Sequence, residues 1–91
     1  MISADLSGRR IIVTGGASGI GLAAVEIMAK LGAKVALNYL PNDETGSLRV
    51  DEFNAAGLEV IGAPGDVGIA GEAEAMISAA IIELDGLDYL I

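Results

Sequence analysis

An eight-residue segment rich in glycine, Thr14 to Gly21, is the part of the chain whose residue types and spacing suit chemistry. It reads Thr-Gly-Gly-Ala-Ser-Gly-Ile-Gly, after the apolar run Ile11 to Val13 and at the start of a helical pattern that begins at Ile20. Glycine lets a backbone turn sharply and approach a ligand closely, because it carries no Cβ atom. Free N–H groups at the start of a helix attract anions. The segment therefore predicts a turn that binds the phosphate groups of a dinucleotide.

The three glycines that define this turn have separate expected roles. Gly15 takes the backbone out of the strand without a Cβ penalty, while Gly19 and Gly21 allow close approach of a pyrophosphate and tight packing of the helix. An ordinary glycine-rich loop would also fit here, but the spacing inside a strand-helix-strand unit favours the nucleotide-binding interpretation. A P-loop is excluded, because neither Lys-Ser nor Lys-Thr follows the last glycine.

The composition of the 91 residues excludes several classes of protein. The sequence has no cysteine and no histidine, which removes disulfides, thiolate nucleophiles and imidazole bases. Its 13 acidic and 5 basic side chains give a formal net charge of −8, which disfavours nucleic acid and anionic lipid as partners. Charged residues interrupt each apolar run before the ~18 residues that a membrane span needs. No signal-peptide pattern precedes Arg9, so we expect a cytoplasmic protein.

Hydrophobic periodicity alternates between the strand and the helix pattern along the chain. Strands are expected at Arg10 to Val13, Val35 to Tyr39, Leu58 to Ala63 and Leu87 to Ile91. Helices are expected from Ile20 to Leu31, ended by Gly32, from Glu44 to Ala56, and along the stripe from Ala73 to Leu84.

The second of these helices has an alternative, because its apolar stripe is irregular. Thr45 to Ser47 could form a loop, with the helix starting only afterwards. In both cases, strands that alternate with helices imply parallel pairing through right-handed crossovers. The expected fold class is α/β, a Rossmann-like doubly wound parallel sheet in strand order 3-2-1-4. The glycine turn would then lie at the carboxyl edge, beside the switch point between strands one and four.

Several segments together resemble a known family. Four segments are similar to the corresponding segments of a classical short-chain dehydrogenase/reductase. They are the motif Thr-Gly-x-x-x-Gly-x-Gly at Thr14 to Gly21, and the segments Gly32 to Val35, Gly65 to Val67 and Leu87 to Ile91. The resemblance implies an oxidoreductase that binds NAD(P) and moves hydride between the nicotinamide and a carbonyl or alcohol carbon. It also implies that residues 1–91 are the N-terminal part of one NAD(P)-binding Rossmann domain, whose full-length form is a homo-oligomer.

The resemblance assigns cofactor contacts to two further places. Asp66 and the backbone N–H of Val67 correspond to the residues that recognise the adenine ring in the family. A structural alternative for Asp66 is that it caps the helix that follows or favours its positive end. Gly68 and Gly71 stand near the start of that helix, where the family more usually has a hydroxyl or acidic residue, so we expect a loose helix start.

The end of the second strand would meet the adenosine ribose. Proteins that prefer NAD place an acid there, and those that prefer NADP supply a base. Asn38 and Tyr39 are neutral, and Ser18 stands in the turn where many NADP-preferring relatives have Arg or Lys. We expect Asn38 to bond either form of the ribose, whereas Tyr39 fits a cofactor contact and a simple strand-end aromatic equally well. The missing carboxylate slightly favours NADP.

The sequence contains no catalytic set. The family uses a Ser and a Tyr-x-x-x-Lys motif; Tyr39 has Asp43 at that offset, and Tyr89 lies two residues before the last residue given. Nor do the acidic residues have the spacing of a metal site. We therefore expect catalytic residues and a small-molecule substrate site only in a full-length form, and no turnover by these 91 residues. Two alternatives are a module that holds a nucleotide without turning it over, and an inactive fragment.

Overall fold

The computed structural model describes residues 5–91 as four strands and three helices in strict alternation. Residues 1–4, on which the expected lack of a signal peptide partly depends, lie outside the described residues. The elements are β1 (Arg10–Val13), α1 (Gly19–Lys30), β2 (Lys34–Tyr39), α2 (Glu44–Ala55), β3 (Val60–Pro64), α3 (Ala70–Leu84) and β4 (Tyr89–Leu90).

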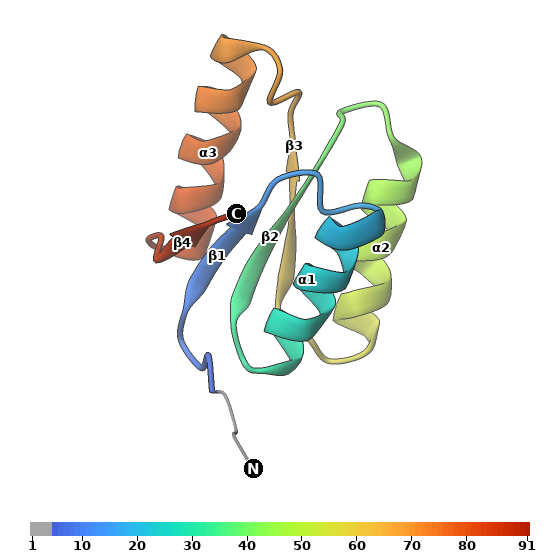
Figure 1. Cartoon of the computed structure of the whole chain (residues 1–91), viewed down its shortest axis with the longest axis vertical. Coiled ribbons are helices and arrows are strands. Elements are labelled where there is room, and N and C mark those ends of the chain that lie inside the picture. The colour runs from blue at the N-terminus through green and yellow to red at the C-terminus, as the bar shows by residue number, and fades with distance from the viewer. Residues whose placement is uncertain (1–4) are drawn as a thin grey trace.

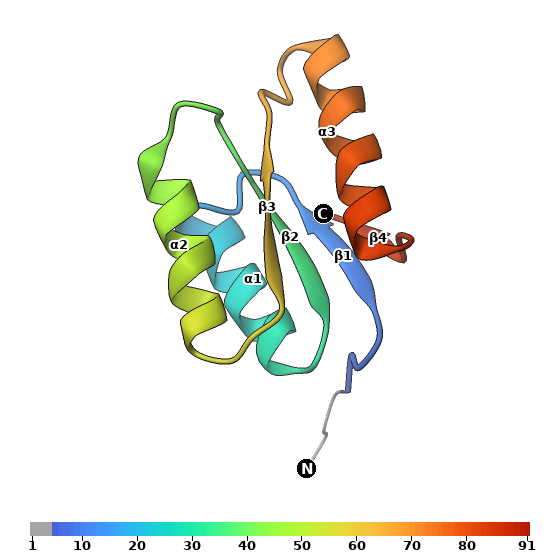
Figure 2. The same cartoon turned by 180° about the vertical axis from the view of Figure 1, so that it is seen from behind.

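The four strands form one parallel sheet in the order β3-β2-β1-β4, which confirms the predicted topology. In register, Ile11 lies opposite Val35 on one side and Tyr89 on the other. Helices α1 and α2 cover one face of the sheet and α3 covers the other, as Figures 1 and 2 show from opposite sides. The chain is therefore a doubly wound α/β unit, as expected for a Rossmann-like fold.

Each face of the sheet has its own apolar core, because successive strand residues point to opposite sides. On the first face, Val25 of α1 packs with strand residues such as Val13 and Leu37. On the second, Ile12 packs with Met76 and other residues of α3. The strands of a sheet covered on both faces are apolar throughout, which explains why periodicity identified them as short continuous apolar runs.

Helix α2 forms from Glu44 onward, so the loop alternative for Thr45 to Ser47 is wrong. The Asp43 side chain caps the helix by accepting a hydrogen bond from the Thr45 amide at 2.9 Å. Gly46 is buried within the helix, where a Cβ atom would overlap the ring of Tyr39. The glycine therefore lets α2 lie directly on that ring, and this packing outweighs the low helix propensity of glycine.

Strand β4 is shorter than the expected Leu87 to Ile91, because only Tyr89 and Leu90 have strand geometry. Its hydrogen bonds to β1 nevertheless extend further. The Asp88 amide donates to the Arg10 carbonyl at 2.8 Å, and the Ile91 amide donates to the Ile12 carbonyl at 2.9 Å. Strand β3 runs from Val60 to Pro64 and so lies slightly later than expected.

An ion pair and a hydrogen bond from Arg10 connect the start of β1 to the turn before β4. Arg10 Nε lies 3.1 Å from an Asp88 carboxylate oxygen, and Arg10 Nη1 donates to the Asp85 carbonyl at 2.7 Å. The hydrogen bond from the Arg10 side chain lowers the pKa of Asp88 below its usual range, and the bond from the Arg10 amide adds to the shift.

None of the described helices is both long and apolar enough to cross a membrane.

Candidate nucleotide-binding site

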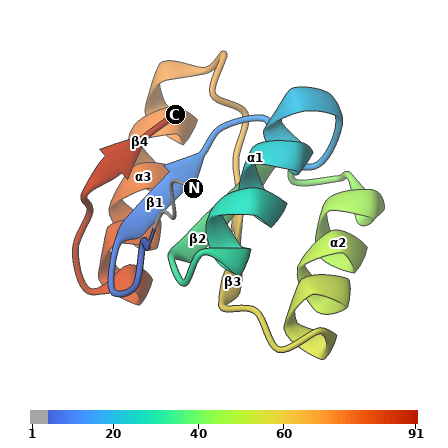
Figure 3. The same cartoon turned by 60° about the horizontal axis from the view of Figure 1, so that its bottom comes forward.

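The turn between β1 and α1 has the backbone that its glycines were expected to provide. Gly15 and Gly19 have φ of +62° and +58°, in the left-handed region that other residues rarely adopt. A Cβ atom built on either residue would meet no protein atom within 4 Å. Both positions therefore face open space, where a ligand can come close to the backbone. The turn follows the carboxyl end of β1, the strand next to β4 in the sheet, as predicted (Figure 3).

Gly21 has the packing role expected of the last glycine in the turn. A Cβ atom at this position would overlap the carbonyl oxygen of Gly15. The first turn of α1 therefore lies directly on the chain that leaves β1, and only glycine permits this distance.

The N-terminus of α1 is suited to an anion. Ser18 is the N-cap residue, with extended backbone, and its exposed side chain makes no capping hydrogen bond. The first turn holds no acidic residue. The amides of Gly19, Ile20 and Gly21 belong to the first turn of a helix, where N–H groups have no partner within the helix. Ile20 directs its side chain into solvent, with 91% of its surface exposed. The helix dipole favours negative charge here.

Asn38, at the carboxyl end of β2, connects this turn to the segment after β3. Its Oδ1 accepts a hydrogen bond from the Gly15 amide at 3.1 Å, while Nδ2 donates to the carbonyls of Ala63 at 2.9 Å and Gly65 at 3.1 Å. The residue is only 3% exposed. Both amide protons and one acceptor position are thus used inside the protein. The ribose contact expected for Asn38 stays a prediction, while the structure shows the side chain bonded to Gly15, Ala63 and Gly65.

Tyr39 packs its ring between two glycines on the α1/α2 face of the sheet. The ring contacts Gly46 of α2 and Gly62 of β3, and the residue is half-buried. This is the arrangement of a strand-end aromatic in a core. Contact of Tyr39 with a cofactor stays a prediction.

Asp66 and Val67 begin the loop between β3 and α3. The Asp66 carboxylate accepts a hydrogen bond from the Gly68 amide at 2.9 Å within that loop, and the N-cap position of α3 is Ile69, which has no side-chain cap. Asp66 therefore orders the loop, and it is not the N-cap residue of α3. The expected loose start of this helix stays a prediction. Val67 is 46% exposed. The loop is held near the glycine turn because the Gly65 carbonyl bonds to Asn38.

A small pocket of about 190 Å³ lies between the glycine turn, the end of β2 and the start of α2. It is lined by Gly15, Ala17, Ser18, Asn38, Tyr39, Leu40 and Asp43. Asp66 and Val67 are not part of its wall. The sequence-based predictions assigned Asp43 no role in the site, so they missed this residue of the pocket. The sequence did contain a signal for Asp43. An aspartate that caps a helix directly after a parallel strand lies at the carboxyl edge of the sheet, where ligands bind.

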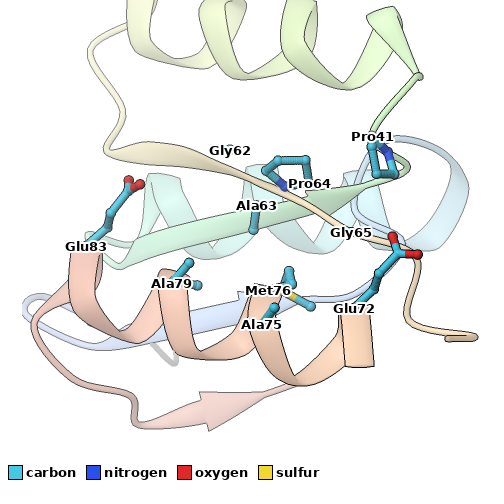
Figure 4. A pocket seen from close by; sticks show the side chains of 11 residues that line it. Pro41, Gly62, Ala63, Pro64, Gly65, Glu72, Ala75, Met76, Ala79 and Glu83 are labelled. Carbon is cyan, nitrogen blue, oxygen red and sulfur yellow. The ribbon is translucent and has the colours of Figure 1, made fainter. Parts of the chain in front are cut away.

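A larger cavity of about 400 Å³ lies elsewhere, between β3 and α3. Figure 4 shows its small side chains, such as Ala75 and Ala79, with Glu72 and Glu83 at opposite ends. It contains no residue of the glycine turn. The larger cavity is therefore not the one beside the glycine turn. Within residues 5–91 no cluster of acidic side chains could hold a metal ion.

Comparison with known proteins agrees with this geometry. Residues 9–91 match the family model for short chain dehydrogenases. The chain is 40% identical over 89 residues to the uncharacterized oxidoreductase YhxD of Bacillus subtilis, covering 97% of this chain and 30% of YhxD. Among solved structures, hydroxysteroid dehydrogenase from Escherichia coli superposes with a TM-score of 0.87 at 29% identity, over 94% of this chain and 35% of that protein.

A second similar solved structure contains a bound nucleotide. It is a blue fluorescent protein from a metagenomic library in complex with NADPH, with a TM-score of 0.87, 30% identity, and coverage of 94% of this chain and 36% of that one. The chain thus spans about a third of the length of these relatives. The family match over nearly all of its residues shows that the chain belongs to the short-chain dehydrogenases.

Proposed function

We propose that this chain supplies the N-terminal, dinucleotide-binding part of an NAD(P)-dependent oxidoreductase. In its full-length form the protein would transfer hydride between the nicotinamide and a carbonyl or alcohol carbon. The observation that carries the proposal is the open space above Gly15 and Gly19, next to the free amides at the start of α1. A pyrophosphate fits this cradle, because it needs close backbone approach and N–H donors.

Each element of the site has a distinct task in the proposed binding. The first-turn amides of α1 hold the pyrophosphate, and the exposed Ser18 hydroxyl borders the same pocket. Asp66 and Val67 receive the adenine ring. Asn38 acts as a positioning residue, because it fixes the Gly15 and Gly65 backbones in one arrangement. When bound, the cofactor supplies the hydride chemistry, and the protein supplies binding and orientation.

The substrate, the homo-oligomeric state and the cytoplasmic location belong to the full-length form and stay predictions. So does the absence of nucleic-acid and membrane partners. The catalytic Ser and Tyr-x-x-x-Lys of the family are likewise assigned to residues outside this sequence, because no such motif occurs within it. A nucleotide-binding module without turnover is the alternative, and it shares the same binding site.

A titration with NAD⁺ and NADP⁺ by isothermal calorimetry tests the binding site. We expect weak binding by the parent chain and none by Gly19→Val, whose branched side chain would fill the space that the phosphates need. Gly57→Val is the matched control, since Gly57 also has positive φ, +85°, and no atom within 4 Å of a built Cβ. Both variants carry similar backbone strain, about 1–2 kcal/mol. If both variants lost binding to the same extent, or if neither variant lost binding, the glycine turn would not be the binding site.

A further inference from the structure

The wall of the pocket beside the glycine turn contains one carboxylate side chain, that of Asp43. Its other lining residues are small, apolar or neutral, apart from the Tyr39 phenol. One carboxylate oxygen of Asp43, Oδ1, accepts the amide hydrogen bond of Thr45. The second oxygen, Oδ2, accepts no hydrogen bond from residues 5–91. The capping bond thus holds the carboxylate at the rim of the pocket and leaves an acceptor for a ligand.

The polar neighbours of Asp43 offer little competition for a sugar hydroxyl. The Asn38 amide is buried and already makes three hydrogen bonds. The Tyr39 ring lies against Gly46 and Gly62, with its hydroxyl at the Gly62 end. Among the side chains that line the pocket, this leaves Ser18 and Asp43 to meet a polar group of the ligand.

Positive charge is absent from the pocket wall. All five basic residues of the chain lie within the described residues, and none lines this pocket. Lys30, Lys34 and Arg49 form ion pairs with Glu26, Glu59 and Glu52. Arg10 pairs with Asp88 at the start of β1, the end of the strand opposite the glycine turn. A phosphate group in this pocket would therefore meet a carboxylate and no cation.

From this arrangement we infer that Asp43 is a specificity-determining residue, which makes the site prefer a dinucleotide with a free ribose 2′-hydroxyl, NAD, over one with a 2′-phosphate, NADP. The inference rests on the proposed function and on the expectation that the adenosine ribose meets the end of β2, where this pocket lies. A carboxylate accepts hydrogen bonds from ribose hydroxyls and repels a phosphate dianion. This inference runs against the slight preference for NADP that the neutral Asn38 and Tyr39 suggested, because Asp43 supplies from the start of α2 the acid that those positions lack.

Asp43→Asn is a suitable test, since asparagine caps a helix as well as aspartate does and so keeps α2 intact. Glu44→Gln is the matched control: it removes the same charge one residue away, on an exposed side chain that does not line the pocket. Dissociation constants for NAD⁺ and NADP⁺ are measured for the parent chain and both variants at low ionic strength. The readout is the ratio of the two constants, which a general loss of stability does not change.

We expect the parent chain to bind NAD⁺ more tightly than NADP⁺, and Asp43→Asn to reduce that preference by about fivefold, the scale of a partly exposed charge interaction. Glu44→Gln should leave the ratio within about twofold of the parent, because screening weakens a more distant exposed charge. Tighter binding of NADP⁺ by the parent, or the same ratio in Asp43→Asn as in the parent, would overturn the inference while the proposed function stands. Binding of neither dinucleotide by the parent chain would overturn both.

Discussion

Replacing Asn38 by alanine removes a buried polar side chain that joins the two halves of the proposed site. The change leaves the Gly15 amide and the carbonyls of Ala63 and Gly65 without their partner, in a place that is 3% exposed. Three hydrogen bonds at about 1 kcal/mol each give a loss of about 3 kcal/mol in the free energy of unfolding. This is a large share of the roughly 5–14 kcal/mol expected for a domain of this length.

Urea denaturation followed by circular dichroism measures this loss. With a slope of about 1–3 kcal/mol per molar urea, the midpoint of Asn38→Ala should fall by about 1–3 M. Asn42→Ala is the control, since it makes the same chemical change on an exposed residue and should alter stability by less than about 0.5 kcal/mol. If Asn38→Ala also lost less than about 1 kcal/mol, Asn38 would not be the residue that fixes the turn.

Four further predictions concern packing, pH, association and turnover. Gly21→Ala should lower the melting temperature measured by circular dichroism, because its Cβ atom overlaps the Gly15 carbonyl oxygen and overpacking costs about 1–3 kcal/mol; an unchanged melting temperature would contradict the close packing of α1. Arg10 lowers the pKa of Asp88, so this pair stabilises the fold at pH values above the unfolded pKa of aspartate, about 3.9. The contribution is lost as the pH falls through the lower pKa of the folded state. Asp88→Asn should therefore flatten the acid limb of a curve of stability against pH. The β4 edge, with Leu90 52% exposed, should cause concentration-dependent association in light scattering, which Leu90→Lys reduces, whereas a monodisperse parent at high concentration would refute this. An absorbance assay with alcohols and ketones at saturating cofactor should show no turnover by this chain and turnover by a version extended by its natural continuation; activity of the short chain would reveal a missed catalytic group.

The fold was largely predictable from the sequence because its signals are local. Apolar strand runs, helical stripes and glycines that end helices each involve residues within one element. Gly32 and Gly57 have the positive φ that ends a helix, +102° and +85°, at the positions where the sequence places those ends. Alternating strands and helices then restrict the topology to parallel sheets with right-handed crossovers. The strand order 3-2-1-4 follows if the fold is Rossmann-like.

The roles of several site residues could not be read from the sequence, because they depend on contacts between distant segments. Asn38 bonds to residues 23, 25 and 27 positions away, which become neighbours only when three strands align. Gly46 suggested a loop, but it lies within α2, where only glycine leaves room for the Tyr39 ring. Asp43 reaches the pocket only because α2 begins directly beside the turn.

Mapping the amides that respond to a dinucleotide tests the central claim most directly. In two-dimensional ¹H–¹⁵N spectra of the chain titrated with NAD⁺, the largest shifts should come from the amides of residues 15–21, with a second set at Asp66 and Val67. The same titration of Gly19→Val should leave these amides unmoved. Shifts confined to the walls of the cavity between β3 and α3, or no shifts at saturating NAD⁺, would contradict a dinucleotide site at the glycine turn.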